Sequence, residues 1–221
     1  MKIYLQGVTM KTIIKRLVIL SSLILLVACD NTLQRTDRLI SLVQENVTQL
    51  VNQLNEIQLA ESDLQADFEE TLHAQGDKLT SFAQGDAKVY QNIKRRQDHL
   101  RKLEELTDQL IEYAEEFTKQ ANKSNLPVAD SQRTVDLMVQ LADDLTTYNE
   151  DYKHSLTLEE QTYQSIASPE MDYTKFFGVF DNVQTLQTTN HINLERVLSH
   201  FEPINTQLIN FKVYLTNLQE D

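Results

Sequence analysis

Residues 194–218 read LERVLSHFEPINTQLINFKVYLTNL, and this stretch decides the fold class of the 221-residue chain. Its apolar residues recur in alternating steps of three and four, at Leu194, Val197, Phe201, Ile204, Leu208, Phe211, Leu215 and Leu218. This spacing places them along one side of an α-helix, as a stripe that packs against partner helices. The pattern therefore predicts a long amphipathic helix within a helical assembly.

Three other segments share this periodicity, and short polar stretches separate them. The four predicted helical segments cover residues 33–73, 88–121, 131–167 and 171–218. Turn-forming residues, glycine and proline among them, interrupt the periodicity in the stretches 76–86, 122–130 and 168–169. Several polar residues occupy positions of the apolar stripes, namely Glu61, Arg96, Thr107, Gln187 and Asn190.

This pattern predicts an all-α fold, an elongated antiparallel bundle of about four long helices with coiled-coil-like packing. Helices of this length extend about 50–70 Å. Pro203 lies inside the last stripe, so we expect a bend around residues 199–202 and no end of the helix. Asp130 and Ser168 are predicted to cap the third and fourth segments.

The N-terminal region has the parts of an export signal. Lys11, Lys15 and Arg16 lie just before the apolar run 17–28, and the string Leu26-Val27-Ala28-Cys29 at its end contains the only cysteine of the chain. A basic region, an apolar region and small residues before the cut are typical of a secretory signal peptide. Because a cysteine at this place resembles the bacterial lipobox, we predict a lipid anchor on Cys29 at the extracytoplasmic face of the cell membrane.

A transmembrane helix is the alternative for this region. The apolar run would span only about 18 Å of a hydrocarbon core about 30 Å thick, whereas its length suits a signal peptide. The predicted organisation is therefore a signal peptide (1–28), a lipidated cysteine with a short tether (29–36) and a helical bundle domain (37–221). A leader that begins at Met10 has the same parts, so Met1 and Met10 are alternative starts.

The chain is acidic, with 20 basic and 33 acidic residues and a net charge of −13. Without residues 1–28, which hold four basic residues, the net charge becomes −17. Nucleic-acid binding needs a basic footprint, so this composition argues against a nucleic-acid partner. No cysteine follows Cys29, so the predicted bundle holds no disulfide and depends on packing for its stability.

No pattern in the sequence predicts a catalytic residue, a metal site or a cofactor. The five histidines lack the spacing of metal ligands. Neighbouring acids such as Glu159 and Glu160 are interpreted mainly as solvated helix faces. No nucleophile motif and no nucleotide-binding motif occurs, so we expect a protein that is not an enzyme.

Two clusters are candidates for a binding surface. The basic one either pairs with nearby acids or docks on an anionic envelope polymer, and it comprises Lys94, Arg95, Arg96, Arg101 and Lys102. The aromatic one surrounds the third connection and comprises Tyr148, Tyr152, Tyr163, Tyr173, Phe176, Phe177 and Phe180. These rings are expected mainly to fill one end of the bundle, with one of the adjacent Phe176 and Phe177 exposed for binding.

Two strings, YQNIKRRQDHLRKLE at residues 90–104 and SLTLEEQTY at residues 155–163, accompany the lipobox at Cys29 and a last helix with Asn205, Asn210 and Lys212. In these features the chain resembles the YkyA-like cell-wall-binding lipoproteins of Gram-positive bacteria. The resemblance implies a helical lipoprotein that faces the cell wall, and it transfers no catalytic residue.

The predicted function is therefore that of a noncatalytic cell-wall-binding or scaffolding module. A coiled-coil regulator or adaptor of a membrane or cell-wall enzyme is the alternative. The predicted partners are the membrane, through the lipid on Cys29, and either a cell-wall polymer or an envelope protein. The ligand, the oligomeric state and the end of the bundle that binds stay open.

Overall fold

The computed structural model describes the backbone of residues 10–73, 78–124 and 126–220. Within these ranges, side chains are described from residue 32 onward, except at positions 78, 173, 219 and 220. Seven α-helices and one 3₁₀ helix occupy the described ranges, and no strand occurs within them. The elements are α1 (Met10–Ser62), α2 (Leu64–His73), α3 (Lys78–Gln84), α4 (Lys88–Ala121), α5 (Val128–Gln164), η1 (Ser165–Ala167), α6 (Tyr173–Leu198) and α7 (Phe201–Glu220).

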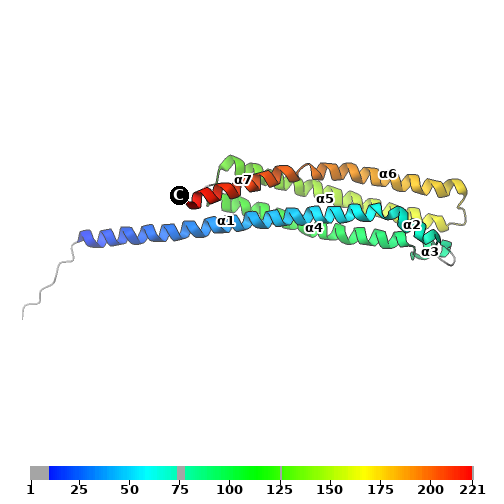
Figure 1. The fold of residues 1–221 in the computed structure, drawn as a ribbon, viewed down its shortest axis with the longest axis horizontal. Helices are drawn as coiled ribbons and strands as arrows, with labels where there is room; N and C mark the ends of the chain where they lie inside the picture. The colour runs from blue at the N-terminus through cyan, green and yellow to red at the C-terminus, as the bar shows by residue number, and fades with distance from the viewer. Residues whose placement is uncertain (1–9, 74–77, 125, 221) are drawn as a thin grey trace, which may run out of the picture.

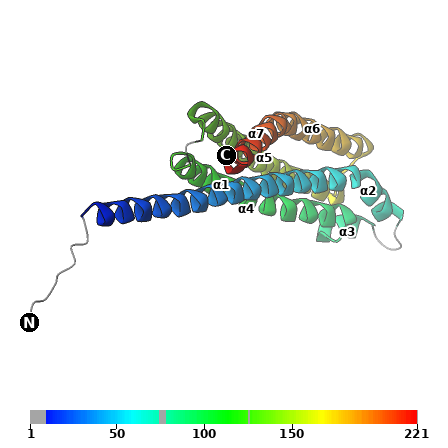
Figure 2. The ribbon, with the colours of Figure 1, turned by 60° about the vertical axis from the view of Figure 1, so that its left-hand side comes forward.

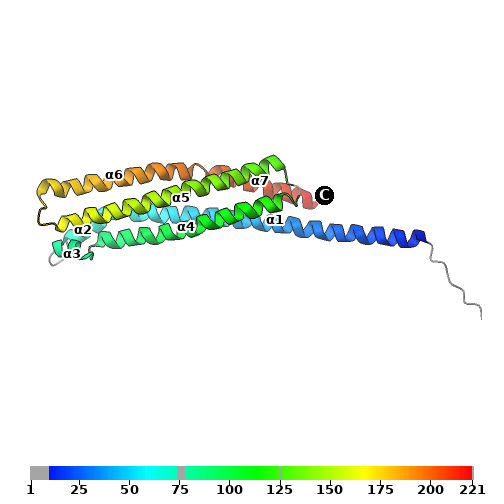
Figure 3. The same ribbon diagram turned by 180° about the vertical axis from the view of Figure 1, so that it is seen from behind.

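The helices form an elongated antiparallel bundle, which confirms the predicted fold class (Figure 1). Its four long members are α1 continued by α2, α4, α5, and α6 continued by α7. Consecutive members pack side by side, and α7 closes the bundle by packing against α1. At one end, the N-terminal part of α1 extends beyond the other helices (Figure 3). The opposite end, which we call the distal end, contains α2, α3, η1 and the start of α6 (Figure 1).

The core follows the apolar stripes. In the last member, Leu194, Val197, Ile204, Leu208, Phe211 and Leu215 are all buried. They share one core with residues of the other three members, among them Ile40, Leu50, Leu54, Leu100, Leu110, Phe117, Met138, Leu141 and Leu145. Burial of these stripes holds together helices that cannot bury an apolar face alone.

Breaks divide the first and last members. Residues 199 and 200 form a turn between α6 and α7, close to Pro203, which cannot donate a backbone hydrogen bond. The position of the bend is as expected, but α6 ends at Leu198, so the expectation of an uninterrupted helix was wrong. The break at Asp63, between α1 and α2, was not predicted. Figure 2 shows that the chain changes direction at α2, which bends away from the axis of α1.

Two predicted helix caps were wrong by a few residues. α5 begins at Val128, directly after Pro127, so Asp130 lies inside its first turn. α6 begins at Tyr173, and its cap is Asp172, whose carboxylate accepts a hydrogen bond from the Lys175 amide at 2.8 Å. The Ser168 hydroxyl instead accepts a bond from the Glu170 amide within the preceding turn, at 3.3 Å.

The segment predicted as a tether, 29–36, is helical and continuous with the rest of α1. Thr36 and Leu39 are already buried against the bundle. The division into signal peptide, tether and bundle remains a prediction, and the side chains of Leu26 to Cys29 lie outside those that the structure describes. In the described part of the chain, no helix is both long and apolar enough to cross a membrane.

Candidate functional site

The basic cluster of α4 divides into one buried and four exposed side chains. Arg96 is completely buried, so its assignment to a surface patch was wrong. Arg95 pairs with two aspartates beside the α1–α2 break, at 3.4 and 3.0 Å, and Arg101 pairs with acids of its own helix. Lys94 and Lys102 are exposed. The surface therefore holds four cationic side chains of this cluster, and two of them, Arg95 and Arg101, are paired with nearby acids.

Arg96 lies in the apolar stripe of α4, three residues after Ile93 and four before Leu100, and it therefore faces the interior. Its guanidinium makes a bidentate pair with Glu159 of α5, at 2.9 Å from Nη1 to Oε2 and 2.5 Å from Nη2 to Oε1. Nε donates a third bond to Asn92 Oδ1 at 2.8 Å. Burial opposes the charge of Arg96, but Glu159 and Tyr152 together outweigh this effect through charge and hydrogen bonds, so the pKa of Arg96 is raised.

This buried network reaches Glu61 of α1. The Tyr152 hydroxyl donates to Glu61 Oε1 at 2.6 Å, and Gln58 Nε2 donates to Oε2 at 2.8 Å. Arg96 Nη1 in turn donates to the Tyr152 hydroxyl at 3.4 Å. Burial raises the pKa of the Glu61 carboxyl, although the Tyr152 hydrogen bond and the charge of Arg96 oppose this shift.

Glu61 also lines a groove of about 620 Å³ that opens on the surface of the distal end. α1 and α2 form one wall of this groove and α6 forms the other, with Tyr163 of α5 contributing to its lining. α6 packs mainly on α5, which leaves the space between α6 and α2 open to solvent. We call this feature the α2–α6 groove.

Aromatic rings line much of the α2–α6 groove. Phe68 and Tyr163 are buried, whereas Phe177 and Phe180 are 50% and 39% exposed. The expectation that one of the adjacent rings Phe176 and Phe177 is exposed is confirmed. Phe180 meets two of these rings nearly at right angles, with centroid distances of 4.8 Å to Phe68 and 5.7 Å to Phe176.

The other rings of the predicted aromatic cluster lie elsewhere. Tyr148 and Tyr152 are buried inside the bundle, with ring centroids 5.5 Å apart. The side chain of Tyr173 lies outside those that the structure describes. The predicted cluster therefore separates into an interior pair and a surface group that surrounds the groove.

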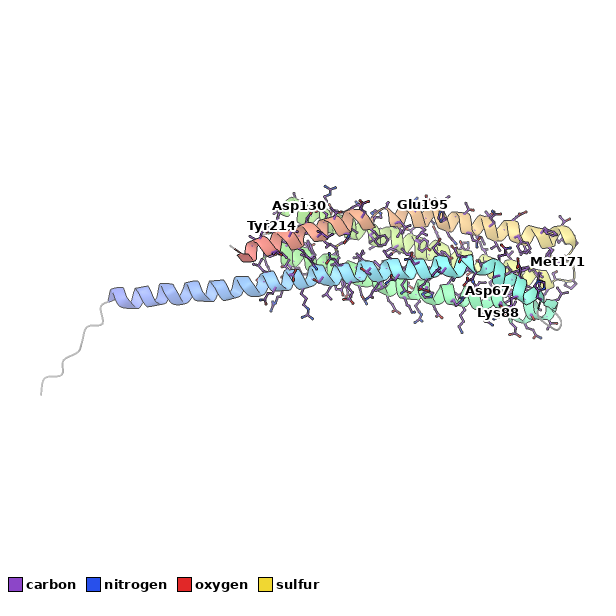
Figure 4. The ribbon with its side chains drawn as sticks, viewed as in Figure 1. Asp67, Lys88, Asp130, Met171, Glu195 and Tyr214 are labelled. Carbon is purple, nitrogen blue, oxygen red and sulfur yellow. The ribbon has the colours of Figure 1, made fainter. Side chains whose placement is uncertain are left out.

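The polar lining of the α2–α6 groove is acidic and amide-rich. It includes Glu61, Gln65, Glu69, Gln184 and Gln187, and no lysine or arginine is among its lining residues in the described part of the chain. Two described lysines at this end of the bundle, Lys88 and Lys175, contact other groups. Lys88, for example, pairs with Glu70 at 3.2 Å (Figure 4 labels Lys88 with Asp67 and Met171 at this end).

His200 and His191 each lie near one acidic side chain. His200 Nε2 lies 2.7 Å from Asp144 Oδ2 of α5, beside the break between α6 and α7. His191 and Glu195 lie 3.5 Å apart on α6. Among the described residues, no group of three or more histidine, cysteine, aspartate or glutamate side chains could hold a metal ion.

The sequence interpretation missed Glu159 and Phe68 as parts of the site. Glu159 was assigned to a solvated face, although it follows Tyr152 by seven residues and precedes Tyr163 by four, which places all three on one helix face. Phe68 lies in the segment 33–73 that was predicted to be helical, but nothing in the sequence indicated that it meets rings of α6. The sequence did contain one indication of a buried network. Glu61 and Arg96 are charged residues of opposite sign, and each occupies a position where the apolar stripe of its helix would have an apolar residue.

Comparison with known proteins gives one family. The sequence model of YkyA, described as "Putative cell-wall binding lipoprotein", matches residues 32–212. This range includes both walls of the α2–α6 groove and the pair formed by Arg96 and Glu159. Searches of curated proteins and of solved structures find no match.

Proposed function

The chain belongs to the YkyA family, and on this premise we propose that it is a noncatalytic, lipid-anchored module that binds the cell wall through the α2–α6 groove. The family description supports a wall-binding lipoprotein. The string that ends in Cys29 supports the anchor. The observation that carries the proposal is the place of the aromatic groove, at the end of the bundle opposite the N-terminal part of α1.

The length of the bundle suits this role. Between residues 29 and 62 a continuous α-helix rises about 50 Å, and the groove lies beside the C-terminal end of that helix. An anchor on Cys29 would therefore hold the groove tens of ångströms from the lipid. The acidic charge of the chain also favours projection away from an anionic membrane surface.

The lining of the groove suits polymer recognition. Exposed rings such as Phe177 and Phe180 offer flat apolar faces on which sugar rings or peptide side chains can pack. Glutamine and glutamate side chains around them provide donors and acceptors that orient a polar ligand. The basic residues of α4 do not line this groove, so the proposal gives them no binding role.

A noncatalytic role is supported by the hydrogen bonds that engage the carboxylates of Glu159 and Glu61. Glu159 is held in a bidentate pair by Arg96, and both oxygens of Glu61 accept hydrogen bonds. These arrangements fix the carboxylates within the bundle and stabilise the contact between α1, α4 and α5.

A second candidate function is regulation of an envelope enzyme by helix–helix contact. Leu198, Ile209 and Val213 of α6 and α7 are 45%, 48% and 56% exposed. Helical steps of 11 and four residues place them near one side of the last member, although the break after Leu198 interrupts the helix. Such exposed apolar residues favour a protein partner at this surface.

Retention of the purified full chain on isolated cell wall tests the proposal. The Phe177→Ala/Phe180→Ala variant is expected to lose about tenfold in retention, equivalent to about 1.4 kcal/mol of binding free energy. The Lys94→Glu/Lys102→Glu variant, which changes exposed residues of α4, is the control and is expected to bind as the wild type does. Equal retention of the wild type and the groove variant would contradict the proposal, and thermal unfolding would verify that both variants fold.

A further inference from the structure

The α2–α6 groove combines aromatic rings with carboxylates, and this combination has a chemical preference of its own. Phe176 is nearly perpendicular to both Phe177 and Phe180, at interplanar angles of 87° and 75°, and Phe180 is nearly perpendicular to Phe68. Rings in such an arrangement present π-faces in several directions around one space. Because the face of an aromatic ring is negative, it attracts a cation that lies over it.

The carboxylates of the groove strengthen the same preference. Glu61 and Glu69 both line it, and no cationic side chain of the described residues does so. Each oxygen of Glu61 accepts one hydrogen bond, from Tyr152 or from Gln58, whereas a carboxylate has about four acceptor sites. Glu61 therefore retains the capacity to accept further bonds. An anionic ligand would meet two carboxylates here and no cationic side chain in the described lining of the groove.

Building on the proposed function, we infer that the groove binds a primary ammonium group carried by a wall polymer. The rings of Phe177 and Phe180 cover the aliphatic carbons that bear the ammonium, Glu61 accepts its N–H bonds, and Glu69 adds negative charge along the groove. A primary ammonium has three donors for a carboxylate, whereas a quaternary ammonium has none. This difference favours the primary form.

The environment of Glu61 supports this assignment. Burial disfavours the ionised carboxylate and raises its pKa, and Glu159 adds further negative charge nearby. Arg96 compensates only in part, because it is engaged in the bidentate pair with Glu159. A bound ammonium would provide the missing positive charge and would favour ionised Glu61.

Chemical acetylation of the wall tests the inference. Purified wall is divided, and one half is treated with acetic anhydride, which converts primary amines into uncharged amides. The full chain is expected to bind the acetylated wall about tenfold more weakly than the untreated wall. Equal retention on both preparations would overturn the inference and leave the proposed function intact. Absence of retention on untreated wall would instead overturn the proposed function, and the inference with it.

A matched pair of variants locates the effect. Glu61→Gln/Glu69→Gln removes two charges from the groove, and Glu45→Gln/Glu112→Gln removes two exposed charges far along the bundle from it. The groove variant is expected to lose about tenfold in retention on untreated wall, while the control stays within about twofold of the wild type. Equal losses in both variants would show that overall acidity attracts the wall, which would overturn the inference.

Discussion

Arg96 and Glu159 lie 63 residues apart in sequence and form a buried bidentate ion pair between α4 and α5. Their side chains are 0% and 3% exposed, in a core that is otherwise mainly apolar. Removing charges from water is costly, and the cost is offset here by close pairing and by further bonds to Asn92 and Tyr152. The pair therefore fixes which faces of α4 and α5 meet.

Replacing only one member of this pair is expected to be costly. Arg96→Met leaves the charge of Glu159 buried without its partner, which should lower the free energy of unfolding by about 3–5 kcal/mol. Arg96→Met/Glu159→Gln removes both charges and should recover part of this loss. Urea unfolding followed by circular dichroism measures the difference. The control Arg95→Met breaks exposed ion pairs and should cost about 1 kcal/mol or less. An equal cost for Arg96→Met and Arg95→Met would contradict the assignment of Arg96 to a buried ion pair.

Adjacent residues of α7 test the predicted stripe. Leu208 is completely buried and Ile209 is 48% exposed. Leu208→Ala should lower the free energy of unfolding by about 2–5 kcal/mol, because it leaves a cavity in the core. Ile209→Ala, a change of similar size at the surface, should alter it by about 0.5 kcal/mol. Thermal or urea unfolding measures the stability of both variants. If Ile209→Ala proved less stable than Leu208→Ala, the buried stripe would lie on the other face of α7.

The cap of α6 provides a third prediction. Asp172→Ala removes the carboxylate that accepts the Lys175 amide hydrogen bond, and it should cost about 0.5–2 kcal/mol of stability. Ser168→Ala, four residues earlier, removes only a longer bond in an exposed turn and should cost less than about 0.5 kcal/mol. If Ser168→Ala proves the more damaging in unfolding experiments, the helix begins earlier than the structure places it.

Glu61 should make stability depend on pH. Its pKa is raised in the folded protein from 4.5, so the native state holds this proton more tightly than the unfolded chain does. The free energy of unfolding contributed by Glu61 therefore falls as pH rises from about 4.5 through the raised pKa. Glu61→Gln has no such proton, and its stability relative to the wild type should increase over this window. Parallel pH profiles for the two proteins would contradict the raised pKa.

Helical periodicity was sufficient to predict most of the bundle. The stripe of residues 194–218 recurs every three to four residues, and it is buried as this spacing requires, apart from half-exposed positions such as Leu218. The bend near Pro203 was also predictable, because proline lacks the backbone donor that a continuous helix needs. By contrast, Asp63 carries no such signal, and the contacts that α2 makes with α4 exist only in the folded bundle.

Contacts between distant segments were not predictable from one sequence. Glu61 and Arg96 were visible as polar gaps, but their connection passes through Tyr152, which is 91 residues from Glu61. The same limit applies to the groove, because Phe68 and Phe180 meet only when α2 and α6 are placed side by side. The predicted cap of the last long helix was wrong for a local reason. Ser168 and Asp172 are both suitable capping residues, and the sequence alone does not choose between them.

Photo-crosslinking in intact cells tests the central claim, that the distal groove faces the wall, most directly. A benzophenone amino acid is placed at Gln184, which lines the groove, or at Asn210, which is exposed on α7 near the opposite end. After irradiation, wall-bound protein that only wall hydrolases release is expected from position 184 and not from position 210. Wall adducts from position 210 alone, or a single membrane-protein adduct from position 184, would contradict the account.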